Sequence, residues 1–329
     1  MFTMQMLISV LLFAVGLVLL IKGGDWFVDG ATGIAKRFNL PDIVVGATVV
    51  SIGTTLPEVM VSTTGALAGS GAMAYGNAIG SIICNTALIA AISITCNPGP
   101  VNTKSMKTPA IFFFVSAALY CLASYVLGEF PRWMGFVMLT IFVVYTVLTV
   151  RNGLKNPDAS EEEAEEGGKE RTLVMELALL VIGAAVIAVG ADLLVEHGQI
   201  IAIGLGVPET VVALLFVALG TSLPELVTTI TSLRKGRASL GVGNVIGANV
   251  FNLVLVSGVA VSLAPFAVPS ENTLLNTGLN LSLVLDIPVM LGVMSLMIFP
   301  ALLKKKLGRW QGVLLLGIYI AFCVCQFVL

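Results

Sequence analysis

Apolar stretches bounded by charged or turn-forming residues recur along the whole chain. Each is about 20 residues long, the length at which an α-helix crosses the hydrocarbon core of a bilayer. We therefore predict about ten transmembrane helices and an all-α polytopic membrane protein. The predicted spans are residues 5–28, 42–67, 74–96, 109–127, 133–150, 173–195, 209–232, 240–264, 286–303 and 311–328.

The composition supports the same class of protein. Hydrophobic residues fill 57% of the 329 positions and charged residues only 11%, whereas an ordinary soluble domain carries about 25% charged residues. So little charge excludes a soluble enzyme. The 17 Lys and Arg residues are balanced by 19 Asp and Glu residues, so no basic excess remains to bind nucleic acid. The partner that the composition favours is the lipid bilayer.

Charges outside the apolar stretches predict how the chain crosses the membrane. Fifteen of the 17 Lys and Arg residues fall in alternate loops, and basic loops stay in the cytoplasm. This distribution places both termini on the outer side of the plasma membrane. A polar linker at 151–171, with five glutamates between positions 161 and 166, then lies in the cytoplasm. We interpret it as a solvated connection.

The chain repeats itself at an offset of 167 positions. Glycine, proline and acidic or amide residues recur at this offset, whereas chance alignment of apolar segments would match Leu and Val. Examples are Pro57 with Pro224, Glu58 with Glu225, Asn77 with Asn244 and Asn85 with Asn252. Because each copy holds an odd number of spans, the second copy enters the membrane from the opposite side. Such inverted repeats are typical of alternating-access transporters.

The repeat also predicts the division of the chain. Residues 1–150 form the first five-helix repeat, 151–171 the acidic linker, and 172–329 the second, inverted five-helix repeat.

A glutamate lies near the middle of the second span, in the stretch Ser51-Ile-Gly-Thr-Thr-Leu-Pro-Glu58. Placing a carboxylate at that depth in the membrane costs at least about 2.5 kcal/mol, so a glutamate there is by default a candidate functional residue. The alternatives are a protonated structural acid and a plain proline kink. Both lose weight because Glu225 repeats the arrangement in Ala218-Leu-Gly-Thr-Ser-Leu-Pro-Glu225.

The prolines explain how this stretch gains ligand atoms. Pro57 has no amide hydrogen, so the carbonyl of Gly53 loses its helical partner, and Pro224 does the same to Gly220. Freed carbonyl oxygens are tolerated in a membrane where they line a polar cavity. Residues 51, 54 and 58 share one helix face. Their oxygens are hard ligands that suit Na⁺ or Ca²⁺.

A second motif follows each of these stretches. It reads Gly76-Asn77-x-x-Gly80-Ser81-x-x-x-Asn85 in the first copy and Gly243-Asn244-x-x-Gly247-Ala248-x-x-x-Asn252 in the second. The paired glycines form a small surface on which helices approach closely. The amides and hydroxyl recur every fourth residue, so they form a polar stripe on one helix face.

Together, G-T-T-L-P-E and G-T-S-L-P-E, each followed by G-N-x-x-G-[SA], resemble the cation/Ca²⁺ exchanger superfamily and best match its sodium/calcium exchanger branch. The resemblance implies a central diamond of cation sites. Glu58 and Glu225 would ligate Ca²⁺ directly. Hydroxyl or carbonyl oxygens would come from Thr54, Thr55, Thr221 and Ser222. Backbone carbonyls for the outer Na⁺ sites would come from Ser51 and Ala218. The ring of ligands around the sites would be completed by Ser81, Asn85 and Asn252.

Two positions depart from the family pattern: many relatives carry Ser at the position of Ala248 and Asp at that of Asn252. The first change loses a hydroxyl ligand and the second a titratable group. Sodium binding is where we expect these changes to act.

The sequence thus predicts a non-enzymatic antiporter that exchanges Na⁺ for Ca²⁺ by alternating access. It acts as a monomer without a prosthetic group, and the first and sixth spans are the expected moving elements. H⁺/Ca²⁺ exchange is the nearest alternative, since buried glutamates also carry protons. A cation channel with a glutamate selectivity ring is less favoured, because pores usually have rotational symmetry. An intramembrane hydrolase lacks a Ser/His or Cys/His pairing with His197 as the single histidine.

Overall fold

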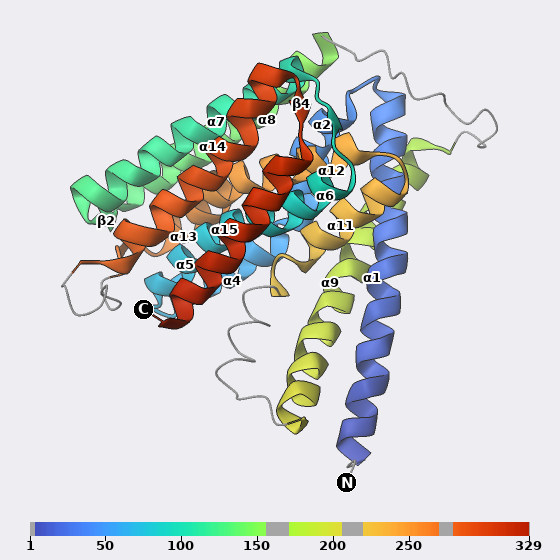
Figure 1. Ribbon diagram of the computed structural model, residues 1–329, viewed down its shortest axis with the longest axis horizontal. Coiled ribbons are helices and arrows are strands. Elements are labelled where there is room, and N and C mark those ends of the chain that lie inside the picture. The colour runs from blue at the N-terminus through green and yellow to red at the C-terminus, as the bar shows by residue number, and fades with distance from the viewer. Residues whose placement is uncertain (1–3, 156–170, 206–219, 270–278, 329) are drawn as a thin grey trace.

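The computed structural model describes residues 4–155, 171–205, 220–269 and 279–328, which are almost entirely helical (Figure 1). The first half contains α1 (Met4–Arg37), α2 (Asp42–Val45), η1 (Gly46–Val50), α3 (Ser51–Thr54), α4 (Leu56–Leu67), α5 (Gly71–Cys84), η2 (Asn85–Ala90), α6 (Ala91–Cys96), α7 (Thr103–Cys121), η3 (Leu122–Leu127) and α8 (Arg132–Lys155). The second contains α9 (Leu173–Gly204), α11 (Leu223–Arg234), α12 (Ala238–Phe251), η4 (Asn252–Val256), α13 (Ser257–Leu263), η6 (Ser282–Asp286), α14 (Ile287–Lys304) and α15 (Arg309–Val328). Segments labelled η are π-helical turns within longer helices.

The predicted membrane class is confirmed. Eight helices in the described ranges are long and apolar enough to cross a membrane, and the bent pair Asp42–Thr54 and Leu56–Leu67 makes a ninth. The predicted span at 209–232 is described only from residue 220 onward, where α11 lies. The linker's glutamates also fall outside the described residues.

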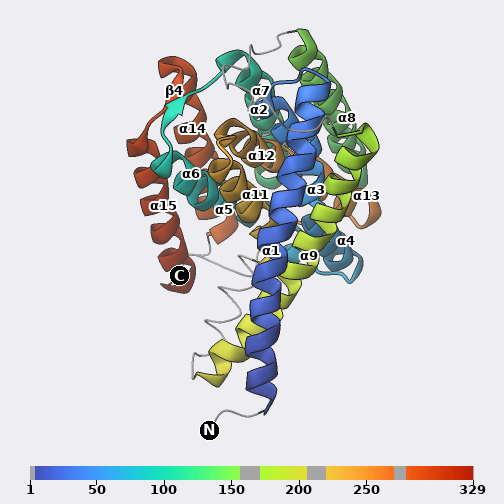
Figure 2. The same cartoon turned by 90° about the vertical axis from the view of Figure 1, so that its right-hand side faces the viewer.

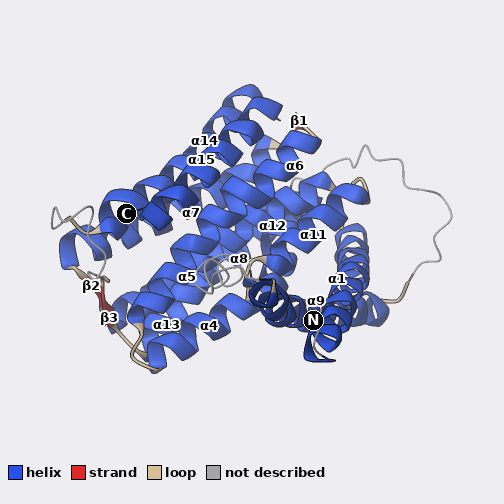
Figure 3. Ribbon diagram, turned by 60° about the horizontal axis from the view of Figure 1, so that its bottom comes forward, coloured by secondary structure: helices blue, strands red, loops and turns tan. Residues whose placement is uncertain are grey.

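Two composite helices form the centre of the molecule. In α5–η2–α6 and α12–η4–α13, 72% and 83% of the most apolar window is buried, against at most 39% in the other single-helix spans. Figure 3 shows α12 near the middle of the helices. These are the helices that carry the Gly-Asn motifs, so the motifs lie on the most buried of the candidate spans.

Helices α1 and α9 form a separate antiparallel pair along one side (Figures 1 and 2). Their glycines allow close contact: a Cβ added at Gly23 would lie 2.9 Å from the Ile187 nitrogen, and one at Gly183 would lie 2.6 Å from the Phe27 nitrogen. The corresponding helices of the two repeats therefore run in opposite directions, as an inverted repeat requires.

Both members of this pair extend farther than predicted, to Arg37 and Gly204 rather than to residues 28 and 195. The sequence prediction ended each span where the apolar run ended. In the folded chain, the charged end of α1 continues as a helix, and its last residue, Arg37, pairs with Glu176 of α9 at 2.8 Å.

Short antiparallel ribbons join loops of the two halves. β1 (Gly99–Pro100) pairs with β4 (Lys306–Leu307), and β2 (Glu129–Phe130) pairs with β3 (Phe266–Ala267). Two-residue strands leave no periodic signal in a sequence, so the ribbons were not predicted. They fix the outer helices of the two halves to each other.

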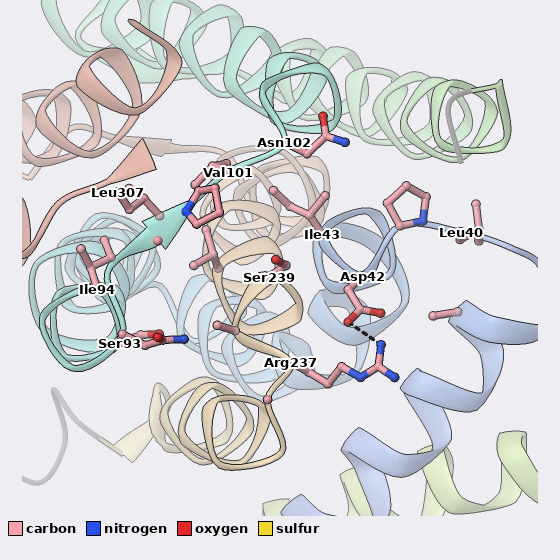
Figure 4. Close-up of a pocket in the computed structure, with 18 of the residues that line it drawn as sticks. Leu40, Asp42, Ile43, Ser93, Ile94, Val101, Asn102, Arg237, Ser239 and Leu307 are labelled. Carbon is pink, nitrogen blue, oxygen red and sulfur yellow. Dashed lines mark hydrogen bonds and ion pairs between the residues drawn. The ribbon is translucent and has the colours of Figure 1, made fainter. Parts of the chain in front are cut away.

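A cavity of about 690 Å³ opens at the end of the molecule where α2 and α12 begin (Figure 4). The ion pair between Asp42 and Arg237, at 3.2 Å, lies in its wall. None of the predicted ion ligands lines this cavity, so it is separate from the candidate site.

Candidate cation site

The chain breaks where the first proline motif predicts a break. Thr55 separates α3 from α4 with φ −86° and ψ −1°, outside ideal helical geometry, and the two helical segments meet at 46°. Pro57 is the second residue of α4, a position where its missing amide is tolerated. The cause is local: the proline cannot bond the Gly53 carbonyl, so the helix is interrupted just before it.

The second copy reproduces this geometry. Ser222, which is 167 positions after Thr55, has φ −87° and ψ 2°, and Pro224 is the second residue of α11. The two motif stretches thus fold alike, as their sequence repeat predicts. Ala218 lies outside the described residues.

Each break places a glutamate in the first turn of the following helix. Glu58 and Glu225 are both 0% exposed. Both oxygens of Glu58 and Oε2 of Glu225 lack a hydrogen-bond partner. Oε1 of Glu225 accepts one long bond from the Thr55 hydroxyl, at 3.5 Å. Neither carboxylate has a basic partner among the ion pairs of the described residues.

The position of the glutamates offsets only part of this buried charge. A carboxylate in the first turn gains about 0.3–1 kcal/mol from the helix dipole, and at most about 2 kcal/mol. Desolvation of an unpaired ion costs several kcal/mol. The protein alone leaves this site short of positive charge.

Hydroxyl groups of the first motif are held by the second repeat. The Thr54 hydroxyl donates to Oδ1 of Asn244 at 3.1 Å. The Ser51 hydroxyl lies 2.9 Å from the Asn244 carbonyl oxygen and 2.8 Å from that of Gly46, and it can donate to either. Asn244 therefore orients two of the predicted ligand residues.

Asn77 of the first repeat has the corresponding role toward a hydroxyl of the second repeat. Its Nδ2 donates to the Ser62 hydroxyl at 2.8 Å and to the Glu58 carbonyl at 3.3 Å. Its Oδ1 accepts from the Thr221 hydroxyl at 3.4 Å. The predicted ligand set omitted both amides, although the polar stripe in the sequence already contained them.

The other two amides begin π-helical turns. Asn85 starts η2 and Asn252 starts η4, and both are 0% exposed. Neither amide atom of Asn85 has a partner. Nδ2 of Asn252 donates to the Ala248 carbonyl at 3.1 Å, which leaves its Oδ1 unpartnered. Such widened turns occur frequently at functional sites, and nothing in the sequence marks them.

Close helix contact brings these parts together. A Cβ added at Gly247 of α12 would lie 2.6 Å from the Ala47 backbone, and one at Gly243 would lie 2.8 Å from Cα of Ile43. The predicted small-residue surface is thus used in the second repeat. In the first repeat, the glycines of this surface are Gly76 and Gly80. The counterparts of Ile43 and Ala47 at the repeat offset, residues 210 and 214, lie outside the described ranges.

The structure therefore gathers most of the predicted ligands in the buried centre. Ser81 is 4% exposed on α5, and Ser222 is 1% exposed with an unpartnered hydroxyl. The residues buried around the two breaks are Ser51, Thr54, Thr55, Glu58, Ser81, Asn85, Ser222, Glu225 and Asn252, with Thr221 half-buried beside them.

Comparison with known proteins shows the family to which the chain belongs. The model of the sodium/calcium exchanger protein family matches residues 8–151 and 175–328, which include both copies of each motif. The chain belongs to the sodium/calcium exchanger family. This is a family of transporters, and its members are not enzymes.

Relatives of this family member cover its full length. It is 33% identical to an uncharacterised membrane protein, MJ0091, of Methanocaldococcus jannaschii, over 96% of this chain and 97% of that protein. It is 29% identical to the sodium/calcium exchanger MaX1 of Methanosarcina acetivorans, over 97% and 99%. The inner membrane protein YrbG of Escherichia coli is 30% identical over 96% of both chains.

A solved structure of the sodium-calcium exchanger NCX_Mj, soaked with Na⁺ and Sr²⁺, has the same fold. The two superpose with a TM-score of 0.78 and 31% identity over 98% of this chain and 99% of that one. The predicted exchanger fold is thereby confirmed.

Proposed function

We propose that this protein is a secondary antiporter that exchanges Na⁺ for Ca²⁺ at the buried centre described above. The observation that carries the proposal is a pair of fully buried carboxylates with no cationic partner, surrounded by further unpartnered oxygens. A divalent cation removes both unpaired charges at once. Na⁺ and Ca²⁺ are the substrates, and no prosthetic group takes part.

The donor set is suited to these ions. Ca²⁺ takes about six to eight oxygen ligands in flexible geometry, and the proposed ligands include carboxylate, hydroxyl, amide and carbonyl oxygens. We assign Ca²⁺ to Glu58 and Glu225. The remaining ligands would be Ser51, Thr54, Thr55, Ser81, Asn85, Ala218, Thr221, Ser222 and Asn252.

Asn77 and Asn244 act as positioning residues. Each accepts a hydroxyl hydrogen from a ligand residue of the opposite repeat, Thr221 and Thr54 respectively. Those hydroxyl oxygens can then face the cation with their lone pairs.

Alternating access requires a part that moves past this centre. The α1/α9 pair meets that need because it packs along one side through glycine contacts and contributes no predicted ligand. The positive-inside distribution of Lys and Arg places the end containing Lys235 in the cytoplasm and both termini outside. We assign the protein to the plasma membrane as a functional monomer, as the prediction from sequence has it.

The relatives support the choice of ions by name. MaX1 is a sodium/calcium exchanger, and NCX_Mj is a sodium-calcium exchanger that was soaked with Na⁺ and Sr²⁺. The same buried glutamates allow H⁺/Ca²⁺ exchange as the competing function.

Flux measurements in proteoliposomes test the proposal. We expect ⁴⁵Ca²⁺ uptake to require an outward Na⁺ gradient and to be unchanged by an imposed pH gradient. Uptake driven by the pH gradient alone would assign H⁺/Ca²⁺ exchange instead. Uptake with equal Na⁺ on both sides and no pH gradient would indicate a channel.

A further inference from the structure

The two repeats differ in how α1 and α9 contact the helices that follow the proline breaks, α11 and α4. In one, α1 packs against α11, and a Cβ added at Gly24 would lie 2.8 Å from the Thr231 hydroxyl. The corresponding pair is α9 and α4, which make no comparable contact.

Side-chain exposure shows the same difference. Thr231 is 4% exposed. Its counterpart Thr64, 167 positions earlier, is exposed, and Met60 on the same face of α4 is 65% exposed. The structure is therefore closed between α1 and α11 and open between α9 and α4.

A lysine spans the closed contact. Lys235 is the first residue after α11, and its ammonium group lies 2.6 Å from Oδ1 of Asp29 and 3.8 Å from Oδ1 of Asp25, both on α1. It also donates to the Asp25 carbonyl at 2.9 Å. Three oxygens of α1 thus contact the one ammonium group of Lys235. Below, the bundle means the helices other than α1 and α9.

The other ion pairs of the described residues do not join the same two bodies. Arg37 pairs with Glu176 at 2.8 Å, which fixes α1 to α9. Arg171, just before α9, pairs with Asp29 at 3.5 Å. The pair between Asp42 and Arg237 lies between α2 and the start of α12. Among the described residues, Lys235 therefore supplies the ionic contacts between the α1/α9 pair and the bundle.

The open side has the acids without the lysine. The counterparts of Asp25 and Asp29 are Asp192 and Glu196, both exposed on α9. The counterpart of Lys235 is Ala68, directly after α4. Within the described part of the chain, Asp192 and Glu196 have no ion-pair partner.

We propose that Lys235 is a one-sided latch, whose bonds to Asp25 and Asp29 favour the conformation closed between α1 and α11. This inference rests on the alternating access proposed above. Because the counterpart of Lys235 is Ala68, a bond that forms only when α1 lies against α11 shifts the ratio of the two end conformations toward that one. With the Lys235 end in the cytoplasm, the favoured resting conformation is outward-facing.

Thiol labelling measures this ratio directly. The five native cysteines are first replaced by alanine, so that a single reporter remains. Thr231→Cys reports opening on the Lys235 side, and Thr64→Cys reports opening on the other. A hydrophilic maleimide reacts where water reaches the thiol, because the thiolate is the reactive form.

Loss of the latch should move the two reporters in opposite directions. Exposed ion pairs are worth about 0.2–1 kcal/mol, which corresponds to a population shift of up to about fivefold. We expect Lys235→Met to speed labelling at Thr231→Cys by about twofold to fivefold and to slow labelling at Thr64→Cys. Arg234→Met, which removes the same charge from the adjacent position, should change neither rate.

A gain of function gives an independent check. Ala68→Lys places an ammonium group where Asp192 and Glu196 can bind it when that side closes. We expect it to slow labelling at Thr64→Cys and to speed labelling at Thr231→Cys. Unchanged labelling in both Lys235→Met and Ala68→Lys would overturn the latch, as would equal shifts in Lys235→Met and Arg234→Met.

These measurements require no ion flux, so the two proposals fail separately. A protein that shows the labelling shifts but no Na⁺-driven Ca²⁺ uptake would refute the exchange function and keep the latch. Uptake with unshifted labelling would refute the latch alone.

Discussion

At the residue scale, the candidate site depends on charge that the protein does not neutralise. Glu58 and Glu225 are fully buried, and the described chain places no Lys or Arg against them. A glutamate inside an apolar run is conspicuous in a sequence, and its recurrence at the same offset made both acids predictable.

The positioning amides were harder to foresee. Asn77 and Asn244 stood in the predicted polar stripe, but their hydrogen bonds reach across to the other repeat. A one-dimensional pattern shows which residues share a helix face. It does not show which distant hydroxyl group lies opposite.

Neutralising one acid tests the ligand assignment. Glu225→Gln keeps the side-chain shape but removes half of the formal charge that binds Ca²⁺. Removing one partner of a buried ionic interaction costs about 3–5 kcal/mol, so we expect Na⁺-driven ⁴⁵Ca²⁺ uptake to fall at least about a hundredfold. Glu129→Gln, at an exposed acid of the two-residue strand β2, should leave uptake unchanged. Near-parental uptake by Glu225→Gln would remove this residue from the site.

The positioning role of Asn244 gives a separate prediction. Asn244→Ala removes the oxygen that accepts from Thr54, so that hydroxyl loses its orientation while both carboxylates remain. We expect the Ca²⁺ concentration for half-maximal uptake to rise about tenfold, the effect of about 1.4 kcal/mol from one lost buried hydrogen bond. Asn249→Ala, a buried amide on the same helix that bonds Thr86 instead, is the matched control. An equal effect in both variants would indicate loss of packing rather than of ligand orientation.

At the element scale, the broken helices were predictable and the π-helical turns were not. A proline removes a specific hydrogen bond, so its consequence follows from chemistry alone. The turns that start at Asn85 and Asn252 have no comparable signal in the sequence. The lengths of α1 and α9 were also underestimated, since both helices continue past the charged residues at which the apolar runs end.

The contact of α12 with the first motif predicts which glycine the fold requires. Gly247→Ala would place a methyl group 2.6 Å from the Ala47 backbone, and overpacking of this kind costs about 1–3 kcal/mol. We expect a lower unfolding temperature in detergent and reduced uptake. Gly317→Ala on α15 meets no atom within 4 Å and should be neutral or slightly stabilising. Equal unfolding temperatures for the two variants would mean that α12 does not pack this closely.

At the scale of the whole molecule, the inverted repeat was predictable and its asymmetry was not. The offset of 167 positions shows which helices correspond, because the matching residues are Gly, Pro, Glu and Asn. Chance alignment of apolar segments would match Leu and Val instead. Which side is closed is a choice between two conformations of the same sequence. The sequence does show that Lys235 and Ala68 differ at corresponding positions. That difference can be interpreted only in the structure, where α1 lies against α11.

A disulfide across the closed contact tests whether α1 must leave α11 during transport. The Cβ that Gly24 would carry lies 3.7 Å from Cβ of Thr231, within the range of about 3.5–4.5 Å that disulfides span. In a background without native cysteines, Gly24→Cys with Thr231→Cys should therefore crosslink on oxidation. We expect exchange to stop, Ca²⁺ binding to persist because the opposite side stays open, and a reductant to restore exchange. The counterpart pair, Ala191→Cys with Thr64→Cys, lies across the open contact and should crosslink more slowly, at a rate that Lys235→Met increases. Full exchange by fully crosslinked Gly24→Cys/Thr231→Cys protein would show that α1 stays on α11 throughout the cycle, and the moving element would then have to be sought among the other helices.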